Sequence, residues 1–258
     1  MKTEFKKYQG TGNDFIIFNN MNGSLPKMSK EKIAGLCHRR FGIGADGLML
    51  LEKAEGYDFR MVYFNSDGSE STMCGNGGRC LVKFAFDLGL ISDKALFVAI
   101  DGPHTAFVKD QIVHLGMMDV YDIEQNSENA FLNTGSPHYV EQCTAIENIN
   151  VFEKGKLIRY SERFSPGGTN VNFMELLPDN TIEVRTYERG VEDETYSCGT
   201  GVTAAAIIAS YKGYTSPVRV KTKGGDLQVA FNPSPDDTFE NVFLIGPAIK
   251  VFEGFVEL

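Results

Sequence analysis

Most of the chain alternates between short apolar runs and turn residues, which is the pattern of β-strands. The predicted strands are Phe15–Phe18, Leu48–Leu51, Phe59–Phe64, Leu96–Ile100, Thr105–Val108, Asn172–Leu177, Thr181–Tyr187, Val218–Lys221 and Leu227–Phe231. Two segments differ, because they are apolar nearly all round and therefore predict buried helices. The first runs through Cys80–Phe86 and should end near Gly89, and the second runs through Val202–Ala209 and should end near Gly213.

Each predicted helix follows a copy of one short motif. Cys74-Gly75-Asn76-Gly77 recurs 124 residues later as Cys198-Gly199-Thr200-Gly201. A tyrosine precedes each cysteine by 11 residues and a glutamate by four, and a strand, a glycine turn and a second strand follow each helix. The repeat predicts an α+β fold of two pseudo-symmetric halves, each a curved, mostly antiparallel sheet wrapped around a central buried helix.

A polar stretch over residues 118–130 suggests where the halves meet along the chain. We therefore expect one half over residues 1–120, carrying Cys74, and another over residues 121–258, carrying Cys198. The last strand is free to cross back to the first half.

Composition narrows the class of protein. The net charge of -9 disfavours nucleic-acid binding, because the phosphate backbone would be repelled. No secretory leader and no apolar stretch near the roughly 20 residues of a membrane span is found, so we expect a cytoplasmic protein without a membrane role. There the five cysteines should be reduced thiols, and their odd number argues against a disulfide framework.

The repeated cysteines suggest proton transfer. A thiol at a helix start meets unpaired N–H groups and the positive end of the helix dipole, which lower its pKa. The same N–H groups can hold a carboxylate. If the halves face each other, Cys74 and Cys198 bracket one pocket, where one thiolate acts as base and one thiol as acid to invert a carbon centre.

Other chemistries find less support. Gly42-Ile43-Gly44-Ala45-Asp46-Gly47 matches a dinucleotide-binding pattern, but a helical segment precedes it and a strand follows, so we interpret it as a tight loop. No Cys-x-x-Cys and no paired histidine spacing indicates a metal site. We find no signal for a pyridoxal-phosphate lysine and expect no cofactor. Cys37, Cys80 and Cys143 are expected to be structural.

Taken together, the motifs resemble the diaminopimelate epimerase family along essentially the whole chain. The resemblance rests on the following segments in order: Gly10-Thr11-Gly12-Asn13-Asp14-Phe15, Gly42 to Gly47, Asn65-Ser66-Asp67-Gly68-Ser69, Met73 to Cys80, Pro137-His138-Tyr139-Val140, Asn170 to Met174, and Glu188-Arg189-Gly190 leading to Cys198-Gly199-Thr200-Gly201. It implies two α/β halves and a cofactor-independent reaction that interconverts LL- and meso-diaminopimelate, in lysine and cell-wall precursor synthesis. It also implies a small amino-acid substrate and, as in many members, a homodimer.

The resemblance assigns roles to particular residues. Cys74 matches the proton donor and Cys198 the proton acceptor. The positions that match substrate-binding residues are Asn13, Asn65, Gly75, Asn76, Asn170, Glu188, Arg189, Gly199 and Thr200. His138 and Glu188 match groups that tune the thiols. Two departures put contacts in question: some members carry a glutamine where this chain has Gly47, and some an asparagine where it has Ser136.

Three alternatives stay open at this point. Proline and hydroxyproline racemases also use two cysteines, but they usually carry a histidine where Asn76 stands. Phenazine-biosynthesis-type isomerases share the fold and lack the cysteine pair. A thiol-based redox sensor would instead use Cys74 and Cys198 to form a disulfide.

Overall fold

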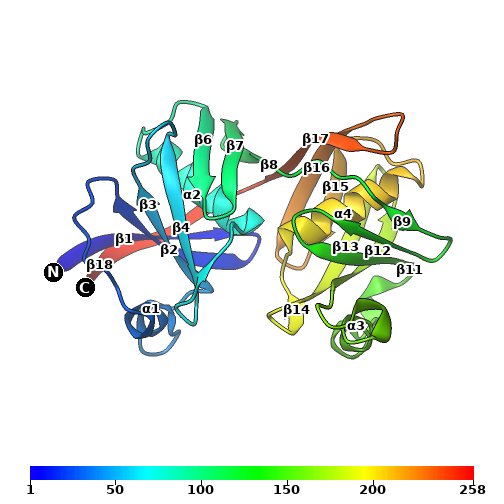
Figure 1. Cartoon of the computed structure of the whole chain (residues 1–258), viewed down its shortest axis with the longest axis horizontal. Coiled ribbons are helices and arrows are strands. Elements are labelled where there is room, and N and C mark those ends of the chain that lie inside the picture. Colours follow the sequence, from blue (N-terminus) through cyan, green and yellow to red (C-terminus); the bar gives the residue numbers. More distant parts are fainter. The chain divides into compact units, whose positions relative to one another are not determined.

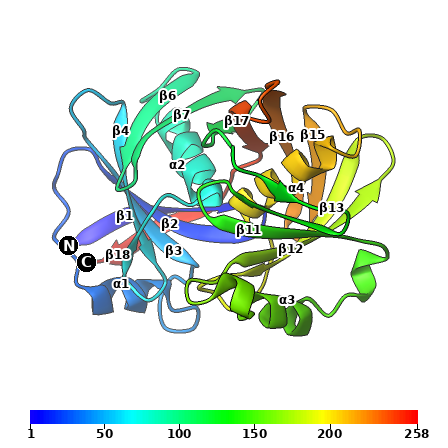
Figure 2. The same ribbon diagram turned by 45° about the vertical axis from the view of Figure 1, so that its right-hand side comes forward.

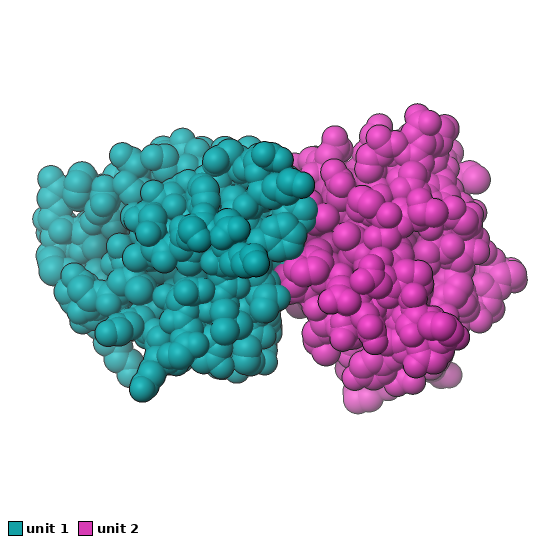
Figure 3. Space-filling model, turned by 90° about the horizontal axis from the view of Figure 1, so that it is seen from above, with its two compact units in different colours: residues 1–115, 246–258 teal, residues 116–245 magenta.

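The computed structural model describes residues 1–258 and divides into two compact units. Unit 1 comprises residues 1–115 and 246–258, and unit 2 comprises residues 116–245 (Figure 3). The C-terminal segment thus belongs to the same unit as the N-terminus, because its strand pairs with the first strand of the chain. None of the helices is long and apolar enough to span a membrane.

Unit 1 contains the first two helices and the strands around them (Figure 1). Its elements are β1 (Lys2–Gly10), β2 (Asn13–Asn20), α1 (Lys30–Cys37), β3 (Gly47–Glu52), β4 (Phe59–Asn65), β5 (Glu70–Ser71), α2 (Gly75–Asp87), β6 (Lys94–Ala99), β7 (Gly102–Lys109), β8 (Ile112–Gly116) and β18 (Ile249–Glu257).

Unit 2 repeats this order with two additional short helical turns. Its elements are β9 (Glu124–Gln125), β10 (Asn129–Asn133), β11 (Pro137–Cys143), η1 (Ile146–Asn148), α3 (Val151–Arg159), η2 (Glu162–Phe164), β12 (Asn170–Leu177), β13 (Thr181–Glu188), β14 (Asp193–Thr195), α4 (Gly199–Ser210), β15 (Val218–Thr222), β16 (Gly225–Pro233) and β17 (Phe239–Gly246).

Strand pairing follows the same scheme in both units. In unit 1, β2 and β3 are parallel across α1, and β4 and β6 are parallel across α2, whereas the neighbouring pairs are antiparallel. In unit 2, β11 and β12 are parallel across α3, and β13 and β15 are parallel across α4, again among antiparallel pairs. The predicted α+β fold of two pseudo-symmetric halves, each mostly antiparallel around a buried helix, is confirmed.

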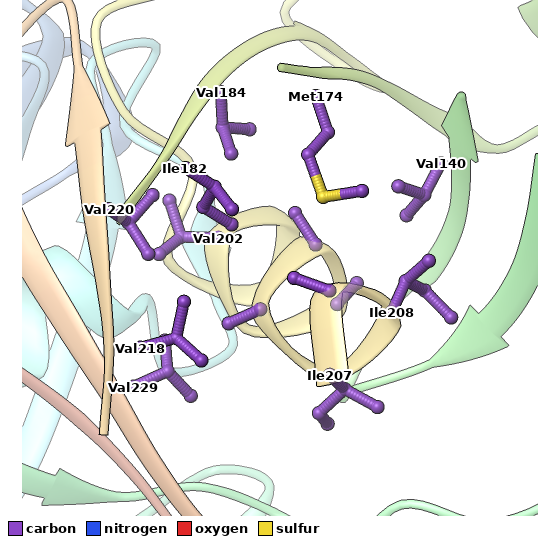
Figure 4. Packing of buried hydrophobic residues seen from close by; sticks show 14 of the residues in the cluster. Val140, Met174, Ile182, Val184, Val202, Ile207, Ile208, Val218, Val220 and Val229 are labelled. Carbon is purple, nitrogen blue, oxygen red and sulfur yellow. The ribbon is translucent and has the colours of Figure 1, made fainter. Parts of the chain in front are cut away.

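Helix α4 forms the centre of unit 2 because its sequence offers no polar face. Every residue from Gly201 to Ala209 is buried. Valine, isoleucine and methionine side chains from β11, β12, β13, β15 and β16 surround it (Figure 4). Successive side chains of a strand point to opposite faces of the sheet. Met174 of β12 therefore points to α4, while the adjacent Phe173 packs with Val151 of α3 in a second cluster.

Helix α2 occupies the corresponding place in unit 1, among the strands (Figure 2). Its glycines allow close packing, since a Cβ at Gly77 would lie 3.3 Å from Met49 and 3.4 Å from Phe15. Helix α1 packs with a separate cluster that includes Phe18, Ile33 and Leu48. The central helices therefore hold the two cysteine motifs at fixed positions, because each is enclosed by strands.

Both central helices begin directly after the repeated cysteines, as the motif predicts. Helix α2 starts at Gly75 and α4 at Gly199, so the repeated glycines form the first turns. The predicted ends are close to the observed ones: Gly89 and Gly213 have φ of 70° and 89°, the left-handed conformation common just after a helix. Helix α3 was not expected from the pattern, because its outer face exposes Phe152 and Leu157.

Candidate active site

Cys74 and Cys198 stand at equivalent positions, as the residues that precede the first helical residue of α2 and α4. Both backbones are extended, with φ, ψ of -101°, 131° at Cys74 and -113°, 112° at Cys198. Their carbonyls accept from the N–H groups of Gly78 and Val202, and neither side chain caps its helix. Each sulfur is therefore attached at the positive end of a helix, an environment that favours a thiolate.

In unit 1, Asn13 links the first hairpin to the cysteine motif. Its Oδ1 accepts from the Cys74 thiol (3.7 Å) and from Asn76 Nδ2 (3.4 Å), and its Nδ2 donates to Asp46 Oδ2 (2.7 Å). The Asp46 carboxylate thus fixes the amide orientation, so that the carbonyl oxygen faces Cys74. These hydrogen bonds bring together three of the predicted site residues, Asn13, Cys74 and Asn76.

Arg79 lies one turn into α2 and is completely buried. Its side chain turns back toward the helix start, where Nη1 donates to Gly75 O (3.3 Å) and Nη2 donates to Asn76 Oδ1 (3.1 Å) and Thr11 Oγ1 (3.2 Å). A Cβ at Gly10 would lie 3.3 Å from the guanidinium, so the glycine makes room for it. The Gly10-Thr11-Gly12 hairpin and Arg79 therefore form one packed unit.

Thr11 adopts an unusual backbone conformation for a β-branched residue. The turn between β1 and β2 has positive φ at Thr11 (48°) and Gly12 (85°), as a two-residue hairpin requires. A branched side chain is strained there. Its hydroxyl accepts the Arg79 hydrogen bond, which accounts for a threonine where asparagine or glycine would fit the backbone better.

In unit 2, Asn170, Ser136 and Arg189 form a polar cluster. Asn170 Nδ2 donates to Ser136 Oγ (2.9 Å), and its Oδ1 accepts from the Arg189 backbone N–H (2.9 Å). The Arg189 guanidinium donates to Ser136 Oγ and to Gly167 O, both at 3.3 Å. The Arg189 side chain is exposed.

His138 is fully buried and depends on Asn172. Asn172 Nδ2 donates to Tyr139 O (2.9 Å) and its Oδ1 accepts from Thr186 (2.9 Å), which fixes the amide. The amide therefore also donates to His138 Nδ1 (3.1 Å), and the ring proton belongs on Nε2, which has no partner. Burial, helped by the charge of Arg189, lowers the pKa of His138 to about 3, so the imidazole is neutral at pH 7.

The Asn172 amide also lies against the cysteine motif of unit 2. A Cβ at Gly201 would lie 2.3 Å from Asn172 Oδ1 and 3.4 Å from Cys198 Cβ. Cys198 itself is 7% exposed, and its sulfur is 3.5 Å from Thr200 Oγ1. Thr134 anchors this turn by donating to Thr200 O (2.8 Å). A chain of contacts thus runs from His138 through Asn172 to the Cys198 turn.

The remaining predicted positions are placed as follows. Gly75 and Gly199 are the first residues of α2 and α4, Asn65 is the exposed last residue of β4, and Glu188 is the last residue of β13. Gly47 leaves no room for a longer side chain, because a Cβ there would lie 2.5 Å from the Tyr63 ring. A glutamine at this position would therefore fit only if the Tyr63 ring moved.

None of the five cysteines forms a disulfide. Burial raises the pKa of Cys37 and Cys143 to about 11 and that of Cys80 to about 12, so these three stay protonated at neutral pH. No cluster of three or more His, Cys, Asp or Glu side chains of the kind that holds a metal ion is present.

Sequence reasoning missed Arg79, Thr11 and Asn172 as members of the two clusters. Arg79 had a signal, since it is a charged residue near the start of a largely apolar helix, without the acidic residue four positions on that Lys83 has in Asp87. Asn172 had a weaker one, an amide in a strand whose neighbours are apolar. Thr11 had none beyond its position in the Gly-Thr-Gly turn, because its role depends on contact with a residue 68 positions away.

The fold of two similar halves, each with a cysteine before its central helix, defines the structural class of the protein. Solved structures of this fold include a phenazine biosynthesis protein of the PhzF family from Bacillus anthracis (TM-score 0.76, 13% identity, all of both chains). They also include a hydroxyproline epimerase from Agrobacterium vitis (TM-score 0.70, 14% identity, 100% of this chain and 93% of that one).

Sequence comparison defines the family within this class. The model of the diaminopimelate epimerase family matches residues 5–117 and 130–251. Diaminopimelate epimerases from Flavobacterium psychrophilum and Aquifex aeolicus are 50% and 40% identical, covering 96% and 97% of this chain and 97% and 96% of theirs. The chain belongs to the diaminopimelate epimerase family.

Proposed function

We propose that this chain is a cofactor-independent isomerase that interconverts LL-2,6-diaminopimelate and meso-diaminopimelate, in lysine synthesis and cell-wall precursor supply. One observation carries the proposal: in a member of this family, a cysteine precedes each of the two buried helices at equivalent positions. The helix starts supply N–H groups and dipole to two thiols, which is what a two-base reaction needs.

The reaction moves one proton in and one proton out. In the direction from LL to meso, the Cys198 thiolate removes the α-proton from one face of the carbon, and the Cys74 thiol delivers its proton to the other face. Cys198 ends as a thiol and Cys74 as a thiolate, and the reverse reaction restores the starting state. The scheme requires that one substrate α-carbon lie between the two sulfurs.

Stabilisation of the carbanion falls to hydrogen bonds at the α-carboxylate. The N–H groups of Gly75 and Asn76 at one helix start, and of Gly199 and Thr200 at the other, are among those that lack a helical acceptor. Such preorganised donors oppose the charge that develops as the proton leaves. Closure that excludes water would strengthen them further.

The second end of the substrate carries another ammonium and carboxylate pair. Arg189 is suited to the carboxylate, because its exposed guanidinium makes only one hydrogen bond to Ser136 and one to Gly167. Asn170 keeps the Arg189 backbone in place. Glu188 is assigned to an ammonium group, and Asn13 and Asn65 to the polar groups of the amino acid.

His138 and Glu188 are assigned to tuning the thiols. Because His138 is neutral, it acts as an Nε2–H donor and not as a cation. A neutral donor stabilises a thiolate without fixing a full positive charge beside it, so the thiol remains able to take up and release its proton near pH 7.

Deuterium exchange tests the function directly. Incubation of the reduced protein with LL-diaminopimelate in D2O should exchange the α-proton, observed by NMR, and form the meso epimer. Cys74→Ala and Cys198→Ala should each abolish epimerisation while keeping the fold, and Cys143→Ala, a thiol outside the motifs, should not. Exchange on proline and none on diaminopimelate would replace this substrate by that of the racemases, and full activity of either motif variant would exclude the two-base scheme.

We further propose a cytoplasmic homodimer. Five cysteines outside disulfide bonds are typical of a reducing compartment. Strand β18 exposes four apolar side chains in unit 1, namely Ile249, Val251, Phe252 and Phe255, each 45–62% exposed, with Phe252 and Phe255 on opposite faces of the strand. Exposed apolar side chains favour burial against a partner, and a second copy of β18 offers the same strand.

A further inference from the structure

Arg79 is a buried positive charge that no carboxylate balances. Its side chain is fully buried, it takes part in no ion pair, and its three acceptors, Gly75 O, Asn76 Oδ1 and Thr11 Oγ1, are all neutral. Arginine stays charged even where burial lowers its pKa, as it does here. A lone cation inside a protein is costly unless an anion lies nearby.

The location of the Arg79 charge makes a nearby anion still more favourable. Arg79 turns back to the first residues of α2, where the helix dipole is already positive. Two positive sources therefore converge at one helix start, and both favour an anion there. The Cys74 sulfur is attached at that start, so its thiolate is the anion that the chain itself can provide.

The neighbouring acidic groups do not supply this anion. Burial raises the pKa of Cys80 to about 12, so this close neighbour stays a neutral thiol. Asp14 is bound by Lys7 and Arg39, and Asp46 by Arg39 and Asn13. Several other charged side chains of unit 1 are also paired: Lys83 with Asp87 on α2, His104 of β7 with Asp101, and Lys6 of β1 and Lys250 of β18 with Glu253.

The equivalent helix start in unit 2 has no such charge. The position that corresponds to Arg79 in the repeat is Thr203, which is also fully buried. Its hydroxyl donates to Gly199 O (2.9 Å), just as Arg79 donates to Gly75 O. The two side chains thus fill the same structural place, and only the one in unit 1 carries a charge.

We infer that Arg79 is a positioning residue that makes Cys74 the more acidic of the two helix-start thiols. This inference rests on the proposed function for its catalytic meaning, since the free enzyme would then carry its thiolate on Cys74. Arg79 acts through its field alone, because a fully covered guanidinium cannot be touched by a substrate. The hydrogen bond from the Cys74 thiol to Asn13 opposes this effect, but thiol hydrogen bonds are weak.

Titration of thiolate absorbance in the full chain tests the inference without substrate. In the Cys198→Ala background only Cys74 should titrate below about pH 9, because burial holds the pKa of the other three thiols at about 11 to 12. Arg79→Met should raise the Cys74 pKa by roughly one to two units, and Arg79→Lys should restore most of the difference. The matched control, Thr203→Val in the Cys74→Ala background, should leave the Cys198 pKa unchanged.

A second measurement needs no change at Arg79, in case its variants do not fold. The Cys74 pKa in Cys198→Ala should be lower than the Cys198 pKa in Cys74→Ala by about one unit. An equal or higher Cys74 value, or a Cys74 pKa unmoved in folded Arg79→Met, would overturn the inference. Deuterium exchange in the parent chain distinguishes the role of Arg79 from the proposed epimerase function. If the parent chain exchanges the α-proton but the two thiols have equal pKa values, only the role of Arg79 is rejected. If the pKa values differ but no exchange occurs, only the epimerase function is rejected.

Discussion

The close contact between Gly201 and Asn172 predicts that a single methyl group will disturb unit 2 from within. In Gly201→Ala the new Cβ would lie 2.3 Å from Asn172 Oδ1, well inside any real contact. The amide cannot rotate freely, because it is bonded to Tyr139 O and to Thr186, and it also supports His138. The substitution must therefore displace a buried, fully bonded side chain.

The expected loss follows from three opposing effects. Replacing glycine by alanine in a helix stabilises it by about 1 kcal/mol. Overpacking a core costs about 1 to 3 kcal/mol, and leaving a buried amide group without its partner costs about 1 to 3 kcal/mol more. The free energy of unfolding should thus fall by roughly 1 to 5 kcal/mol, which is large against ordinary protein stabilities of about 5 to 15 kcal/mol.

The repeat provides a matched control at Gly77, the equivalent glycine of α2. A Cβ there meets Met49 Sδ at 3.3 Å, and a methionine can adjust, so Gly77→Ala should change the free energy by less than about 1 kcal/mol. Urea unfolding of both variants gives the comparison, and epimerase assays should show the larger activity loss for Gly201→Ala. Combining Gly201→Ala with Asn172→Ala should recover much of the excess cost. Equal effects at Gly77 and Gly201 would refute a rigid amide at this position.

Two further predictions concern His138 and β18. Because the unfolded chain protonates His138 below about pH 6.5 and the folded chain only near pH 3, the free energy of unfolding should fall as the pH drops through that window, by about 2 kcal/mol between pH 6.5 and 5. His138→Gln should flatten this dependence in urea titrations, and parallel curves for parent and variant would contradict the buried neutral imidazole. For β18, Val251→Lys should shift the chain toward monomer in sedimentation equilibrium if this strand forms the dimer interface, whereas Lys94→Glu, on β6, should not; an unchanged dimer would exclude β18.

Periodicity predicted the architecture well, because each half is built around a helix with no polar face. A segment such as Val202–Ala209 has only one stable environment, the interior of a sheet layer, so its burial could be read from the sequence. The repeat of the cysteine motif then indicated that the second half copies the first. Helix α3 was missed, because it packs through few buried residues, among them Val151 and Gly155, and leaves the rest exposed.

The site was predictable in its residues and less so in its connections. The motif position Asn13 contacts both Cys74 and Asn76, yet the Asp46 bond that orients Asn13 joins residues 33 positions apart. The pairing of Asn172 with His138 depends likewise on two parallel strands, β11 and β12. Local sequence specifies the types of side chain and the helix starts, whereas long-range pairing of strands decides which amide meets which ring.

The two halves keep the same helix start but surround it with different chemistry, and inversion of a carbon centre explains both facts. Each thiol needs a lowered pKa, so the extended cysteine followed by a glycine turn occurs twice. The two protons, however, are exchanged beside different substituents of an asymmetric carbon, so identical surroundings would not serve both faces. A buried charge accompanies Cys74 through Arg79, whereas Cys198 stands beside Asn172 and its neutral His138. If a permanent charge sets the acidity of one thiol and a neutral network that of the other, removal of Arg79 should slow the steps in which Cys74 donates a proton, because a thiol of higher pKa is a weaker acid.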